Sequence, residues 1–151
     1  MKNKITFMVL SMLVMPGMVF AAGYDLADSE YNLAVNELSQ VPYNQSAHIE
    51  QHGQSNNALI DQRGSKLLGV ISQNGGSNSA HINQSGSTNF AYIDQAGSAN
   101  SASINQDAFG NSAVIIQKGS GNRADITQYG TQKTAVVVQR QSQMAIRVIQ
   151  R

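Results

Sequence analysis

The sequence predicts an all-β fold: a β-solenoid or cross-β stack of five 22-residue strand-turn-strand repeats with two facing parallel sheets, preceded by a signal peptide and a short leader. Three observations support this prediction. Gln recurs at every eleventh position from Gln51 to Gln150, inward and outward positions alternate with period two, and Gly recurs where a turn is needed. A helix would scatter the repeated positions around its axis, so a helical repeat is excluded.

Residues 1–21 are predicted to be a secretory signal peptide. Lys2 and Lys4 form a basic region, residues 5–14 are almost wholly apolar, and small residues precede a cleavage site between Ala21 and Ala22. The alternative is a membrane anchor, but the apolar run is shorter than the roughly 20 residues that a spanning helix needs. We therefore expect the mature chain to leave the cytoplasm.

Residues 22–43 form an acidic leader that differs in composition from everything after it. Four acidic residues and no Lys or Arg give this segment a net charge of −4, and apolar residues between Leu26 and Leu38 recur at helical spacing before Pro42. Two interpretations remain open. The leader is either a solvated segment or an address that an export or assembly partner recognises.

Residues 44–151 are predicted to form the repeat domain, with repeats near 44–65, 66–87, 88–109, 110–131 and 132–151. The consensus is Asn-x-Ala-x-Ile-x-Gln-x-Gly-x-x. Gln fills its column without exception: Gln51, Gln62, Gln73, Gln84, Gln95, Gln106, Gln117, Gln128, Gln139 and Gln150. Asn is found at Asn56, Asn78, Asn89, Asn100, Asn111 and Asn122. The departures from the Asn and Gly columns are Leu67, Ala108, Lys133, Gln141 and Met144.

These columns predict how the repeats stack. In an extended chain Asn, Ala, Ile and Gln all point to one face, and one repeat cannot bury that face alone. If each strand pairs with its equivalent in the next repeat, identical amides lie about 4.8 Å apart and donate to one another along the stack. We expect the Gln and Asn residues to form such amide ladders, with Ile and Ala forming a narrow continuous core.

The outward columns are expected to differ between the two sheets. Odd-numbered strands carry an apolar stripe that includes Leu68, Val114, Ile116 and Val136, whereas even-numbered strands are mostly polar outside. The stripe is an ordinary exposed surface, a surface covered by residues 24–38, or a lateral contact with another subunit. The sequence leaves these three alternatives open.

Charge is concentrated in the final repeat. Lys133, Arg140, Arg147 and Arg151 give residues 133–151 a net charge of +4 with no acid. One interpretation is that these cations protect an edge against uncontrolled strand pairing. The other is that they attach the protein to an anionic surface of lipid or protein.

A stack of parallel repeats has two edges with unpaired backbone groups, and the chain ends at Arg151 inside the last expected strand. Only the leader is left to cover the first edge. We therefore expect edge-on addition of like strands, which is templated amyloid growth, together with self-association.

The repeat pattern, the leader segment 23–27 and the terminal segment 132–147 resemble the minor curlin subunits of the curlin repeat family. This resemblance implies a nucleator that templates the major curlin subunit into curli, the extracellular amyloid fibres of adhesion and biofilm. It also implies secretion through an outer-membrane pore, a surface accessory factor, and retention on the outer cell surface. By the same resemblance, Lys133, Arg140, Arg147 and Arg151 belong to the anchoring repeat, and residues 22–43 match the leader that the pore recognises.

Composition argues against other classes of function. The chain has no Cys and a formal net charge of +1, which excludes disulfide frameworks, thiolate zinc sites and a uniformly basic nucleic-acid binder. We expect no enzyme, no cofactor and no metal; His48, Glu50 and His52 are interpreted as surface residues. Two alternatives to a nucleator remain, a fibre-forming structural subunit and a monomeric β-solenoid adhesin.

Overall fold

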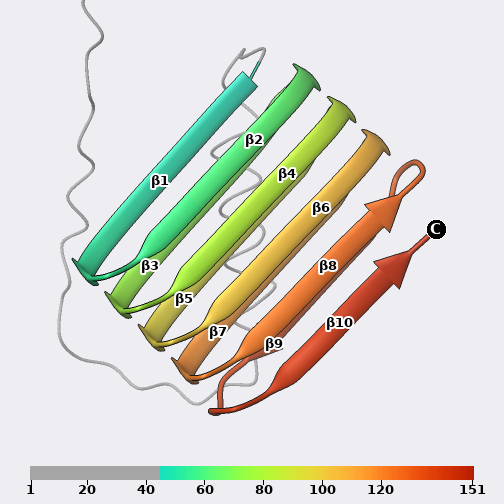
Figure 1. Cartoon of the computed structure of the whole chain (residues 1–151). Coiled ribbons are helices and arrows are strands. Elements are labelled where there is room, and N and C mark those ends of the chain that lie inside the picture. The colour runs from blue at the N-terminus through green and yellow to red at the C-terminus, as the bar shows by residue number, and fades with distance from the viewer. Residues whose placement is uncertain (1–44) are drawn as a thin grey trace, which may run out of the picture.

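The computed structural model describes residues 45–151, and this part of the chain is entirely strand and turn. Ten strands form two five-stranded parallel sheets, with strand orders β1-β3-β5-β7-β9 and β10-β8-β6-β4-β2 (Figure 1). The predicted all-β solenoid of stacked strand-turn-strand repeats is confirmed. The predicted signal peptide, its cleavage site at Ala21 and Ala22, and the acidic leader lie outside the described residues.

The strands follow the period of the sequence. Their bounds are β1 Gln45–Gln54, β2 Asn57–Ser65, β3 Leu67–Gly76, β4 Ser79–Ser87, β5 Phe90–Ser98, β6 Ser101–Phe109, β7 Ser112–Ser120, β8 Arg123–Tyr129, β9 Thr134–Gln139 and β10 Ala145–Gln150. Each strand pairs with the next strand but one along the chain, so that Ile49 lies beside Ile71 and Gln51 beside Gln73. The described residues include no helix that could cross a membrane.

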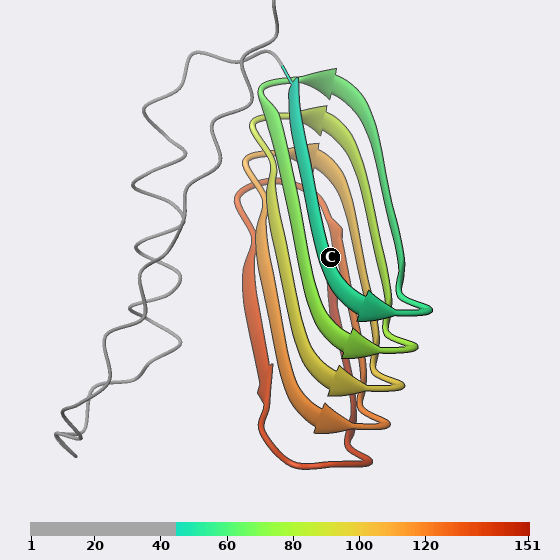
Figure 2. The ribbon, with the colours of Figure 1, turned by 90° about the vertical axis from the view of Figure 1, so that its left-hand side faces the viewer.

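One odd-numbered strand and the even-numbered strand after it form one rung of the stack, and we call the turn that joins two successive strands an arc. The rungs are numbered 1 (β1–β2) to 5 (β9–β10). Figure 2 shows each rung as a flattened loop, with its two strands running in opposite directions on opposite sides of the core. Successive rungs repeat this loop in register, so that equivalent residues form columns along the stack.

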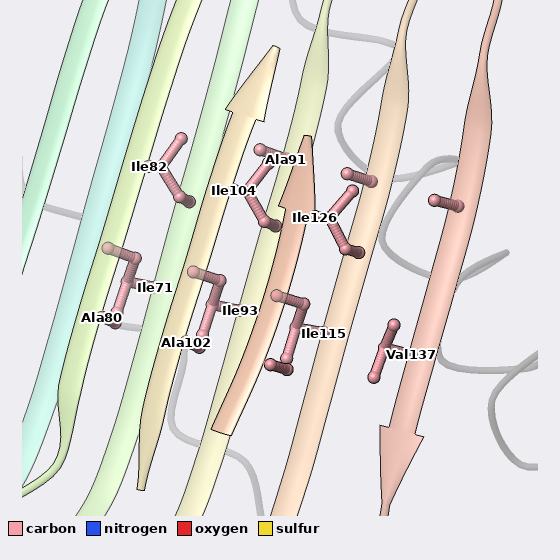
Figure 3. Close-up of a cluster of buried hydrophobic side chains, with 13 residues drawn as sticks. Ile71, Ala80, Ile82, Ala91, Ile93, Ala102, Ile104, Ile115, Ile126 and Val137 are labelled. Atoms are coloured by element: carbon pink, nitrogen blue, oxygen red, sulfur yellow. The ribbon is translucent and has the colours of Figure 1, made fainter. Parts of the chain in front are cut away.

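The core is a column of Ile and Ala side chains between the two sheets. In Figure 3 Ile71, Ile93 and Ile115 of one sheet point toward Ile82 and Ile104 of the other. These five Ile side chains are fully buried. Burying one such side chain stabilises the folded state by about 1.5–3 kcal/mol. Small Ala residues opposite the Ile column allow the sheets to approach closely, so the core needs few aromatic residues.

The Gly column marks the first of two left-handed positions in every arc except the last. Gly53, Gly75 and Gly97 have φ angles of 108°, 120° and 123°. A Cβ atom built on Gly53 would lie only 1.9 Å from the carbonyl O of Gly75 in the rung below. The sequence predicts a turn at Gly that needs either positive φ or close backbone approach, and these three glycines show both, which favours Gly over residues with a Cβ.

The second left-handed position lies two residues further along each arc, and the sequence analysis missed it. It is occupied by non-Gly residues in most arcs, with φ of 58° at Ser55, 58° at Thr88 and 54° at Ala99. In every arc after the first two, the N–H of this residue donates to a carbonyl one rung above, as Thr88 does to Ser65 at 3.0 Å. This rung-to-rung bond offsets the roughly 1–2 kcal/mol that a left-handed conformation costs an L-residue. Only Gly110 and Gly121 in this column gave a sequence signal.

Candidate functional site: amide ladders and the edges of the stack

The Gln side chains form two ladders, one along each sheet. Gln51, Gln73, Gln95, Gln117 and Gln139 belong to the first ladder, and Gln62, Gln84, Gln106, Gln128 and Gln150 to the second. In both ladders the Nε2 of each Gln donates to the Oε1 of the Gln one rung below, over 2.6–2.9 Å. The structure therefore brings all ten predicted Gln residues together along the stack.

Each Gln also bonds across the core to the backbone of the opposite sheet. Gln73 Nε2 donates to the carbonyl O of Asn57, and Gln95 Nε2 donates to that of Ser79 at 3.0 Å. Because a carbonyl can only accept, this bond fixes which end of the amide is nitrogen. Every Oε1 consequently points toward the preceding rung, and the ladder has one direction throughout.

The ladders satisfy polar groups in a dry interior. Gln84, Gln95 and Gln106 are 0% exposed, and no buried side-chain N or O within residues 45–151 lacks a hydrogen-bond partner. A buried amide without partners costs about 1–3 kcal/mol, whereas a made hydrogen bond contributes about 0.5–1.5 kcal/mol. The ladder therefore stabilises the contact between rungs, and a rung without Gln would leave buried amide groups of its neighbours without partners.

The Asn side chains occupy the corners where an arc meets the next strand. Asn78, Asn100 and Asn111 are buried, and the backbone N–H of Asn100 donates to Asn78 Oδ1 at 3.1 Å. Asn78 Nδ2 in turn donates to the carbonyl O of Gly97, in the arc one rung below. Each Asn thus joins its own corner to the backbone of the next rung, and Gln45 makes the equivalent bond to Gly64 at 2.6 Å.

The departures from consensus have separable effects. Leu67 fills an Asn corner and is 0% exposed, so one corner is apolar. Ala108 replaces a Gly and keeps a φ of 106°. Strands β4 and β6 stay paired through Ser87 and Phe109, but β6 and β8 separate after Asp107 and Tyr129. The Cβ of Ala108 occupies the space that the carbonyl below would need, which explains why pairing stops there.

The last arc departs from the others in a different way, because Gln141 lacks the positive φ of the Gly column. A Cβ built on Gly119 would lie 3.2 Å from the carbonyl O of Gln141, compared with 1.9 Å for Gly97 above Gly119. Strands β9 and β10 are 6 residues each, against 10 and 9 in β3 and β4. The Gln ladders therefore continue to the last rung. The arc of the last rung, in contrast, does not lie as close to the arc above it as the other arcs do.

The two ends of the stack present different groups. At the first rung, Gln51 Oε1 and Gln62 Oε1 accept no hydrogen bond from any residue in the described range, and Ile49 is 43% exposed. At the last rung, Gln139 and Gln150 each have one amide N–H directed away from the stack, because Nε2 carries two hydrogens and one is used across the core. One edge offers acceptors and the other offers donors.

The four cations of the final repeat surround rung 5 without forming one compact patch. Lys133 lies half-buried at the corner before β9, Arg140 follows β9 at the opposite end of the rung, and Arg151 follows β10. Arg147 points outward from β10 and lies 3.7 Å from Asp125 of rung 4. A six-residue strand spans roughly 20 Å, so cations are distributed around the whole perimeter of the rung.

Charged residues of the first rung are paired instead. His52 Nε2 lies 2.8 Å from Glu50 Oε1, and Arg63 donates to Asp61 at 2.8 Å. Residues 45–151 contain no cluster of three or more His, Cys, Asp or Glu side chains that could hold a metal ion.

The outward apolar stripe is not uniformly exposed. Leu68, Val114 and Ile116 are 4%, 1% and 2% exposed, whereas Val136 is 45% exposed. Residues 24–38, one of the proposed covers, lie outside the described residues. Cover by this segment and lateral contact with another subunit therefore both stay predictions.

An in-register parallel β-solenoid with buried Gln and Asn ladders belongs to the class of stacked β-repeat proteins, and its amide ladders are those of cross-β structures. The model of the curlin associated repeat matches residues 67–97, 77–107 and 97–130. This part of the chain is similar to the curlin repeat family.

Individual relatives agree with this family. The minor curlin subunit of Escherichia coli (strain K12) is 68% identical over 58 residues, which is 38% of this chain and 38% of that protein. The minor curlin subunit of Salmonella typhimurium is 66% identical over 60 residues, or 40% of each chain. The matched region thus spans less than half the length of these curated relatives. No solved structure matches the chain.

Proposed function

We propose that this chain is a surface-anchored nucleator that templates the major curlin subunit into extracellular amyloid fibres for adhesion and biofilm. The observation that carries the proposal is the in-register stack itself. Each terminal rung presents Gln amide groups and strand backbone groups of the kind that interior rungs use to hold their neighbours. The relatives named minor curlin subunit support a role as a component of curli.

The physical reason for nucleation is the cost of the first rung. Ordering one residue costs about 1–2 kcal/mol, and an isolated rung leaves its Ile and Gln side chains without neighbours. A preformed edge supplies those neighbours at once. An incoming repeat then buries its Ile residues, extends the Gln ladder and pairs its backbone in a single step, so the slow phase of fibre formation is shortened.

The final rung is proposed to anchor the fibre to the outer cell surface. Arg140 and Arg151 are exposed and have no ion-pair partner within residues 45–151, and Lys133 and Arg147 add to the positive charge of the rung. Its interaction partner is an anionic surface or the accessory factor of the secretion system. Within this proposal residues 22–43 are the segment that the outer-membrane pore recognises, and the protein catalyses no reaction.

A seeding assay tests nucleation. Trace amounts of the mature chain, residues 22–151, are added to purified major curlin subunit while amyloid formation is followed by dye fluorescence. We expect the lag phase to shorten as the amount added is raised. A heat-denatured sample of the same chain serves as the control, because it lacks the ordered edge. An unchanged lag phase with folded protein contradicts the nucleator role.

A truncation tests anchoring. Deleting residues 133–151 removes all four cations but leaves rungs 1–4 with their Gln ladders. We expect the truncated chain to be released from cells into the medium and still to seed in solution. The matched control keeps the rung and replaces Lys133, Arg140, Arg147 and Arg151 by Gln. Retention of both variants on the cell surface is incompatible with anchoring by this rung.

A further inference from the structure

We infer that the edge of rung 1, formed by β1 and β2, is the edge that templates growth, and that it selects an incoming rung with Gly in its arcs and Asn at its corners. This inference rests on the proposed nucleation. Its occupant is a second chain of the same 11-residue repeat, docked parallel and in register, and the final rung of another copy of this protein is a poorer fit.

The direction of the Gln ladders shows how such a rung docks. Gln51 Oε1 and Gln62 Oε1 are the acceptors at the first edge, and in every interior rung the equivalent oxygen receives an N–H from the Gln above. A rung that continues the stack therefore approaches with the edge at which its amide N–H groups are directed outward. This head-to-tail arrangement repeats without closing, so growth is open-ended.

The arcs impose the first selection. A Cβ on a Gly-column residue points toward the rung below and would lie 1.9 Å from the Gly75 carbonyl at Gly53, and 1.7 Å from the Gly86 carbonyl at Gly64. The incoming rung must therefore also carry Gly above Gly53 to approach as closely. A second copy of this chain would place Gln141 there.

The corners impose the second selection. In the interior, Asn Oδ1 accepts the backbone N–H of the corner residue one rung below, as Asn56 does for Asn78 at 3.0 Å. An incoming rung that supplies the same bond to the Asn56 N–H needs Asn at that corner. The final rung of a second copy would place Met144 above Asn56 and Lys133 above Gln45, and neither side chain offers an oxygen acceptor.

The opposite edge lacks the same features. Rung 5 has Lys133 and Met144 at its corners, so it presents no Asn Oδ1 to a further rung, and its arc is open at Gln141. It also carries the four cations. If this rung faces the cell surface, the first rung points away from it, and the anchoring and templating functions lie at opposite ends of the stack.

A pair of matched charge substitutions tests the assignment. Ile49→Lys and Val148→Lys each place a cation in the inward β-branched column, at the first and at the last strand of the stack. The mature variants are used to seed the major curlin subunit, after circular dichroism has established that both retain β-structure. We expect Ile49→Lys to lower the seeding efficiency about tenfold or more, the factor that corresponds to about 1.4 kcal/mol. Val148→Lys is expected to seed like the unsubstituted chain.

The outcomes separate the two proposals. If the unsubstituted chain does not shorten the lag phase, nucleation itself is wrong. If it seeds and Val148→Lys abolishes seeding while Ile49→Lys does not, the other edge templates and the inference is overturned. Equal seeding by both variants, or equal loss in both, also overturns a single templating edge.

A gain-of-function variant tests the selection without depending on a damaged edge. Replacing Lys133 by Asn, Gln141 by Gly and Met144 by Asn gives the final rung the consensus arc and corners. We expect this chain to polymerise with itself faster than the unsubstituted chain by about tenfold, because each interface gains hydrogen bonds and a closer arc. Substituting Ile49→Lys in the same chain should abolish the gain. A triple variant that polymerises no faster contradicts the proposed selection.

Discussion

The second and the last rung of the stack are built from the same inward pattern and differ at their arcs. Rung 2 and rung 5 both bury their odd-strand Gln, with Gln73 at 1% and Gln139 at 0% exposure. Rung 2 also keeps Gly75 and Gly86 in tight arcs, whereas rung 5 has an open arc at Gln141 and shorter strands. The comparison shows that the inward columns attach a rung to its neighbour, while the arcs and corners decide how closely the next rung can follow.

The largest effect is expected from breaking an interior ladder. Gln95→Leu removes the bonds to Gln73, Gln117 and the Ser79 carbonyl, all in a buried site. We expect the free energy of unfolding to fall by about 3 kcal/mol, since several polar groups lose a partner at once. The midpoint of chemical denaturation, followed by circular dichroism, measures the loss.

The matched substitution in rung 5 is Gln150→Leu. Gln150 accepts from Gln128 and donates to the Thr134 carbonyl, and its side chain is only half-buried. The expected loss is about 1 kcal/mol, because water replaces part of the lost bonding. Equal losses at Gln95 and Gln150 contradict the view that burial gives the ladder its strength.

A smaller difference is expected between glycines of a tight and an open arc. Gly75→Ala places a Cβ 1.9 Å from the Gly97 carbonyl, whereas the nearest atom to a Cβ on Gly130 is Lys133 Cε at 3.9 Å. Both positions have positive φ, so both variants carry backbone strain of about 1–2 kcal/mol. Only Gly75→Ala adds the steric clash.

We therefore expect Gly75→Ala to unfold at a lower denaturant concentration than Gly130→Ala by the equivalent of about 1–2 kcal/mol. Hydrogen exchange at the arc amides locates the effect. If the two variants are equally stable, rung spacing at the arcs does not depend on the missing side chain.

The smallest effect is a stabilisation. Ala108→Gly removes the one Cβ that interrupts pairing between β6 and β8, at a φ of 106°. We expect a gain of about 1 kcal/mol from relief of backbone strain and closure of the arc. Ala99→Gly is the control, because Ala99 is left-handed but keeps its rung-to-rung bond to Gly76 at 3.0 Å. A similar gain in both variants would mean that pairing at Ala108 is not limited by its side chain.

The inward columns illustrate what can be predicted from sequence. Side-chain alternation in a strand has a fixed period, so Ile71, Gln73 and their equivalents had to share one face once the chain was extended. The unchanging spacing between equivalent strands then left in-register stacking as the way to bury that face. The ladders were therefore predictable from spacing alone.

Other features depended on the third dimension. Ser77, Thr88 and Ala99 have no intrinsic preference for left-handed backbone, and in their arcs the rung above supplies a carbonyl that accepts the N–H of this residue. The burial of Val114 and Ile116 on the outward side of β7 was likewise not evident from their column, for which the sequence left exposed and covered alternatives open.

The sequence by itself determined the repeat, the inward columns, and the contrast between a charge-poor stack and a cationic last repeat, because each follows from the identity and spacing of residues along the chain. The tertiary structure decided the direction of the amide ladders and hence the difference between the two edges. A Gln amide is symmetric in shape, and only the backbone carbonyl across the core, as at Gln95 and Ser79, determines which end donates.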